Sequence, residues 1–219
     1  TSVTYNVTFS ANTPCDILIV GGGGGGSSGH GGGGGAGALV FMKSVTMPAG
    51  TYAFKVGAGG ANGKGSDTTI KSGATTVLAA EGGGAGGAGN PGGNGGSGGG
   101  GDGWTTSGSA GDPNPGQANN PGSSVFSYNG ATGVKYGNNG GTATASSSAG
   151  AGGGGAGQSG YDNYNTSFNG YGGNGRTNAV VGGVTYDFVS LFGTTYGTNN
   201  DNNNTRYFAG GGGGGRVLN

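Results

Sequence analysis

The stretch that decides the fold is Ile17-Leu18-Ile19-Val20-Gly21-Gly22-Gly23-Gly24-Gly25-Gly26, in which four aliphatic residues lead directly into six glycines. A short aliphatic run of this kind is typical of a buried β-strand. The six glycines exclude an α-helix, because each glycine in a helix interior costs about 1 kcal/mol relative to alanine. The sequence therefore predicts a strand that is followed by an extended glycine segment.

The same alternation recurs along the chain, which has 65 glycines among its 219 residues. Apolar residues reach 30% and charged residues only 7%, whereas an average domain has about 45–50% and about 25%. A large apolar core and a salt-bridged surface are both excluded. Collagen is excluded as well, because the Gly-X-Y period is absent and the chain has only 6 prolines. The glycine tracts lie at residues 21–26, 31–35, 82–89, 92–101, 152–157 and 210–215.

Short strands are predicted between these tracts. Two pairs of segments are predicted to form hairpins, one around Pro48-Ala49-Gly50 and one around Ser72-Gly73-Ala74, where turn-forming residues interrupt apolar alternation. The predicted strands are residues 3–9, 17–20, 39–45, 51–56, 68–71, 75–78, 125–128 and 184–189.

Two interpretations of the tracts remain, a disordered linker or extended glycine chains packed side by side. An extended threefold helix makes no internal hydrogen bonds, so its amides and carbonyls can pair with neighbouring chains. A linker would have no reason to place apolar residues against nearly every tract, as Val20 before residue 21 and Phe208 before residue 210 do. We therefore expect ordered packing.

The predicted fold class is mostly β and irregular. Short antiparallel strands form a small sandwich or sheet, fused to a packed bundle of polyglycine II helices, with essentially no α-helix. We expect a single glycine-rich domain over residues 1–219, with a strand-rich part at 1–80 and a glycine-helix bundle with polar aromatic loops at 81–219. Because the chain begins at Thr1 without Met, we expect a processed protein or a piece of a longer one.

Four stretches carry a family resemblance: residues 17–26, 31–40 and 47–60, and Tyr207-Phe208-Ala209 leading into residues 210–215. They resemble the glycine-rich domain of phage tail-fibre and adhesin proteins, in which glycine helices pack as a lattice. The resemblance implies a scaffold whose loops contact a host surface, and an extracellular or virion-surface location.

The inventory of chemical groups does not favour an enzyme. His30 is the only histidine, Glu81 the only glutamate and Cys15 the only cysteine, so a catalytic triad, a carboxylate pair or a metal site has few members to draw on. We expect no catalytic, metal or cofactor-binding residues and no cofactor. The 8 basic and 8 acidic residues give no basic face for nucleic acid, and a four-residue aliphatic run is too short for membrane insertion.

Aromatic residues among asparagine, serine and glycine are the best candidates for surface contact, because rigid rings supply contact area and amides supply hydrogen bonds. Such loops suit a cell-surface glycan or a protein receptor. The alternative is that these rings cap the lattice or meet a neighbouring subunit. The candidate residues are Trp104, Tyr161, Tyr164, Phe168, Tyr171 and Tyr196.

The amino-terminal strand is a candidate assembly device, because Val3, Tyr5, Val7 and Phe9 alternate with polar residues. It can pair within its own domain, which we favour, or add to the edge of another copy and build a homopolymer. The predicted function is a non-enzymatic structural and adhesive building block of an extracellular or virion-surface fibre. The alternatives are a self-assembling filament subunit linked by this strand, and an ice-binding protein.

Overall fold

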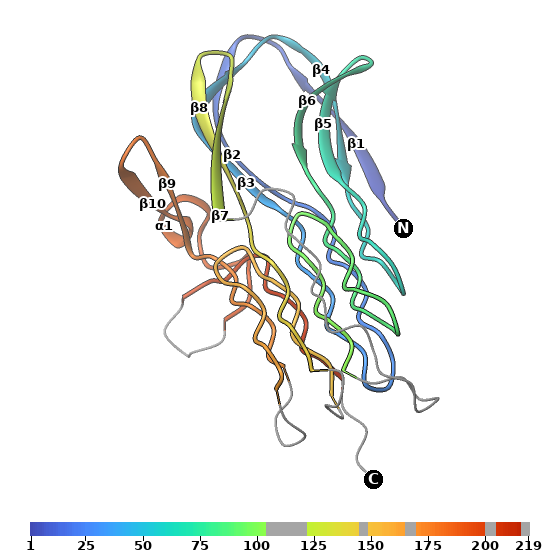
Figure 1. Ribbon diagram of the computed structural model, residues 1–219. Helices are drawn as coiled ribbons and strands as arrows, with labels where there is room; N and C mark the ends of the chain where they lie inside the picture. Colours follow the sequence, from blue (N-terminus) through green and yellow to red (C-terminus); the bar gives the residue numbers. More distant parts are fainter. Residues whose placement is uncertain (104–121, 145–148, 165–169, 200–204, 216–219) are drawn as a thin grey trace.

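The computed structural model describes residues 1–103, 122–144, 149–164, 170–199 and 205–215. Strands gather at one end of the molecule, and the glycine tracts run from them toward the other end (Figure 1). The prediction of a mostly β fold with antiparallel sheets and essentially no α-helix is confirmed for these residues. The described part contains one helix, α1 (Phe188–Phe192), of five residues.

Two four-stranded antiparallel sheets form the strand-rich end. The first has the order β1-β4-β5-β6 and the second the order β2-β3-β8-β7, while β9 and β10 form a two-stranded sheet of their own. Their bounds are β1 Val3–Phe9, β2 Thr13–Val20, β3 Leu39–Met47, β4 Gly50–Val56, β5 Thr68–Ser72, β6 Thr75–Ala80, β7 Gly122–Tyr128, β8 Ala131–Gly137, β9 Asn178–Val181 and β10 Val184–Asp187.

The burial of strand β3 shows that the second sheet lies between two other layers of the fold. Its successive side chains point to opposite faces, and residues 39–42 are buried on both. Phe41 belongs to a cluster with Phe188 of α1, whereas Met42 belongs to a cluster with Ile70 of β5 in the first sheet. The second sheet is therefore covered by the first sheet on one face and by β9, β10 and α1 on the other.

The predicted hairpin around Pro48-Ala49-Gly50 is wrong. Strand β3 pairs with β2 and β8, and β4 pairs with β1 and β5, so the chain crosses from one sheet to the other at this point. Neighbours occupy both edges of β3, which leaves no edge for β4 to pair with. The predicted hairpin around Ser72-Gly73-Ala74 is confirmed as β5 and β6.

The strand predicted at residues 184–189 is too long, because β10 ends at Asp187 and Phe188 begins α1. The Asp187 carboxylate accepts the Ser190 amide at 2.8 Å and caps the helix. Strands also occur after residue 80, as β7 to β10, and the segment 21–38 before residue 80 is largely glycine. Strand-rich and glycine-rich segments thus alternate through both predicted parts.

Residues 150–157, called the central tract, are the best-connected glycine segment. From residue 150 to residue 156, residues three apart donate their amide protons to the same neighbouring segment, over 2.8–3.0 Å, whereas Gly157 donates to Asn174. The bonds run from Gly150, Gly153 and Ala156 to residues 209–215, from Ala151 and Gly154 to residues 98–101, and from Gly152 and Gly155 to residues 158–161.

The carbonyl oxygens of the central tract accept hydrogen bonds from three further segments, namely residues 33–36, 170–173 and 138–141. Close approach requires glycine here: a Cβ atom built on Gly153 would lie 2.1 Å from the carbonyl oxygen of Gly34. The absence of side chains lets the backbones come close enough to pair their own polar groups.

Candidate contact surfaces

The structure brings two of the predicted contact residues together. The rings of Tyr161 and Tyr171 meet edge to face, with centroids 6.3 Å apart and planes at 89°. Their backbones lie side by side, because the Tyr161 amide donates to the Tyr171 carbonyl oxygen at 2.8 Å. We call these two residues the tyrosine pair. Their side chains are 47% and 66% exposed, so both rings offer contact area to solvent.

Polar side chains extend the tyrosine pair. The Gln158 amide donates to the Tyr161 hydroxyl at 3.0 Å, and the Asn174 amide donates to the Gln158 carbonyl oxygen at 2.9 Å. Sequence reasoning missed Gln158 and Asn174. The only signal for Gln158 is its place in a reversal between glycines, in Gly157-Gln158-Ser159-Gly160, which brings residues 158–161 back alongside the central tract.

Tyr164 lies three residues after Tyr161 and is 65% exposed. Its hydroxyl donates to the Asp162 carboxylate at 2.6 Å. This hydrogen bond, together with the negative charge of Asp162, raises the pKa of the Tyr164 phenol. The hydroxyl therefore stays protonated, and the carboxylate orients it at the surface.

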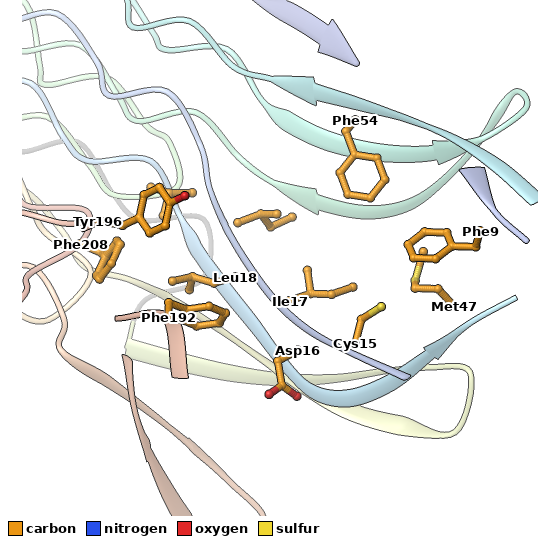
Figure 2. Close-up of a pocket in the computed structure, with 12 residues that line it drawn as sticks. Phe9, Cys15, Asp16, Ile17, Leu18, Met47, Phe54, Phe192, Tyr196 and Phe208 are labelled. Carbon is orange, nitrogen blue, oxygen red and sulfur yellow. The ribbon is translucent and has the colours of Figure 1, made fainter. Parts of the chain in front are cut away.

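Tyr196 lies elsewhere, in an apolar cleft between the two large sheets (Figure 2). The cleft has a volume of about 500 Å³. Strand β2 forms one wall along its length, and aromatic rings from distant parts of the chain close the two ends. The lining residues are Phe9, Cys15, Asp16, Ile17, Leu18, Ile19, Val20, Met47, Phe54, Phe192, Tyr196 and Phe208.

The one carboxylate that lines the cleft is held at its rim. Asp16 forms an ion pair with Lys43 at 2.9 Å and accepts the Ser44 amide at 2.8 Å. Figure 2 shows its carboxylate turned away from the labelled rings. Desolvation raises the pKa of this carboxyl, but the Ser44 amide and the Lys43 ammonium together bring it below its ordinary value.

The predicted assembly strand is β1, at the edge of the first sheet. All seven of its residues pair with β4, in antiparallel register. Val3, Tyr5 and Val7 are exposed, whereas Phe9 is half-buried and packs edge to face on Tyr52 with ring centroids 5.6 Å apart. Pairing within the domain is thus what the structure has, and the outer edge of β1 faces no other described strand.

Two predicted contact residues, Trp104 and Phe168, lie outside the described residues. Within the described ranges, no group of three or more histidine, cysteine, aspartate or glutamate residues is placed to hold a metal ion. The same ranges contain no helix long and apolar enough to cross a bilayer.

Laterally bonded glycine tracts and short antiparallel sheets define a class of glycine-rich domain. A family model described as a glycine-rich domain matches residues 1–219, so the chain belongs to that family. No curated protein and no solved structure matches the chain significantly.

Proposed function

We propose that this chain is a non-enzymatic structural and adhesive building block of an extracellular or virion-surface fibre. Its tracts act as packed polyglycine II helices and form a stiff body. The observation that carries the proposal is the donation pattern of the central tract, in which residues three apart between positions 150 and 156 bond to one neighbour. A polyglycine II helix has three residues per turn and no internal hydrogen bonds.

Stiffness follows from this bonding. Each hydrogen bond contributes about 0.5–1.5 kcal/mol net, and all eight amides of residues 150–157 donate to neighbouring segments. A six-residue tract spans about 19 Å at 3.1 Å per residue. A body of such tracts resists bending as a strand sandwich does and needs little apolar core.

The tyrosine pair supplies the adhesive part of the proposal. Two exposed rings at right angles, bordered by the amides of Gln158 and Asn174, offer apolar faces beside hydrogen-bonding groups. This combination suits the face of a sugar ring and its hydroxyls. The favoured partner is a cell-surface glycan.

The test is binding of the labelled protein to a glycan array. We expect the double variant Tyr161→Ala/Tyr171→Ala to lose at least about tenfold in affinity, because exposed aromatic anchors dominate such contacts. Tyr5→Ala is the matched control, since it removes an exposed ring from β1. Equal binding by the double variant and the wild type, or no glycan bound by the wild type, contradicts the adhesive role.

A further inference from the structure

Two of the described glycine tracts each carry exposed backbone amides that donate no hydrogen bond. Among the described residues, the amides of Gly23 and Gly26 and those of Gly210 and Gly213 donate no hydrogen bond, and all four residues are exposed. In each tract the two residues are three apart, so both point the same way. We call these four residues the open face.

The two tracts of the open face approach the same buried residue. A Cβ atom built on Gly26 would lie 3.7 Å from the Gly34 amide nitrogen, and one built on Gly212 would lie 3.3 Å from it. Tracts 21–26 and 210–215 therefore flank residues 31–36. Within the described residues, the Gly34 amide has no hydrogen-bond acceptor.

Glycine at the open face has no explanation within a single copy. A Cβ atom on Gly23 would meet nothing closer than 3.9 Å, and one on Gly213 nothing closer than 3.6 Å, with no positive φ at either. Alanine at such positions would stabilise the fold, because it reduces the conformational entropy of the unfolded chain. In the central tract the same atom on Gly153 would lie 2.1 Å from another backbone. Glycine is needed where another chain comes that close.

We infer that the open face is a self-association surface that binds the open face of a second copy of this chain. A twofold axis perpendicular to the tracts would set the tracts of the two copies antiparallel. The body already contains antiparallel tract pairs, because Gly32 donates to Gly87 and Gly35 to Gly84. Among the described residues, the carbonyl oxygens of Gly26, Gly210 and Gly213 accept no hydrogen bond, whereas that of Gly23 accepts the Gly60 amide. The partner face therefore offers extended backbone with free acceptors and no side chains.

The apolar cleft continues this surface toward the strands. Val20 lines the cleft and directly precedes tract 21–26, and Phe208 lines it just before tract 210–215. A face formed by exposed amides alone would gain little free energy on association, since its hydrogen bonds to water are only exchanged for hydrogen bonds to the partner. Burying the apolar wall of the adjoining cleft adds favourable hydrophobic free energy.

Sedimentation velocity on the full chain tests the inference. We expect the wild type to sediment as a dimer, and Gly23→Leu/Gly213→Leu to sediment as a monomer with an unchanged circular dichroism spectrum. Gly63→Leu is the matched control, because a Cβ atom there meets nothing within 4 Å and Gly63 is outside the open face. It should remain dimeric.

A wild type that stays monomeric at the highest soluble concentration overturns the inference. A double variant that still dimerises does so as well, and so does an equal loss of the dimer in the Gly63→Leu control. The Tyr161→Ala/Tyr171→Ala variant should dimerise like the wild type, so failure of the adhesive role and failure of this interface give different results.

Discussion

The amide of Gly33 donates to the carbonyl oxygen of Ala151 over 2.9 Å and so joins two tracts that are far apart in the sequence. A Cβ atom at Gly33 would lie 2.0 Å from the carbonyl oxygen of Gly212, in a third tract. Gly33 therefore donates a hydrogen bond to one neighbouring tract and, because it has no side chain, packs closely against another. This double requirement accounts for a protein in which glycine replaces most of the usual core.

The first prediction compares two glycines in neighbouring tracts. Gly153→Ala should destabilise the fold by about 1–3 kcal/mol or more, because the added methyl group overlaps the Gly34 carbonyl and forces backbones apart. At a protein concentration where the chain is monomeric, Gly213→Ala should leave the stability within about 0.5 kcal/mol or raise it. Chemical denaturation gives both values. Equal losses at the two sites would contradict lateral close packing.

The second prediction concerns the cluster between the second sheet and α1. The Phe188 side chain is fully buried against the rings of Phe41, Phe192 and Phe208. Phe188→Ala should cost about 3–5 kcal/mol in the free energy of unfolding. Val184→Ala, at an exposed position of β10, is the control and should cost far less. Similar denaturation midpoints for the two variants would show that this cluster is not a core.

The third prediction concerns pH. The pKa of the Asp16 carboxyl lies below its ordinary value of 3.8, so its ionised form stabilises the folded state above that value. This contribution is lost as the pH falls through the folded-state pKa. The melting temperature of the wild type should therefore fall more steeply than that of Asp16→Asn below about pH 4. Parallel curves in acid would show that the Lys43 and Ser44 contacts add no stability.

The fourth prediction concerns Tyr164. Because Asp162 raises the pKa of the phenol, Asp162→Asn should shift its titration to lower pH. Ultraviolet absorbance of tyrosinate, taken as a difference between variants with and without Tyr164, follows this group alone. An unchanged titration midpoint would mean that the hydrogen bond does not persist in solution.

Local sequence patterns predicted eight of the ten described strands, because alternation and aliphatic runs are properties of neighbouring residues, but they missed β8 and β9. The runs at residues 3–9 and 17–20 became β1 and the last four residues of β2. Which strands pair was less predictable, as the crossing between β3 and β4 at residues 48–49 shows. The turn residues Pro48-Ala49-Gly50 suit a hairpin and a crossing equally.

The partners of the tracts could not be predicted, because every six-glycine segment has the same composition and only long-range packing decides its neighbours. For the same reason the sequence did not show that Tyr161 would lie beside Tyr171, while Tyr196 would line the cleft. Phe192 was missed because the sequence predicted a strand up to residue 189, whereas residues 188–192 form a short helix.

The central claim is that the tracts are rigid and bonded to one another, and residue-resolved hydrogen exchange tests it most directly. The amides of residues 150–157, which donate to neighbouring tracts, should exchange orders of magnitude more slowly than those of an unstructured glycine peptide. Gly23 and Gly213 should exchange rapidly in a monomeric preparation. Exchange of the central tract at the rate of an unstructured peptide would contradict the account.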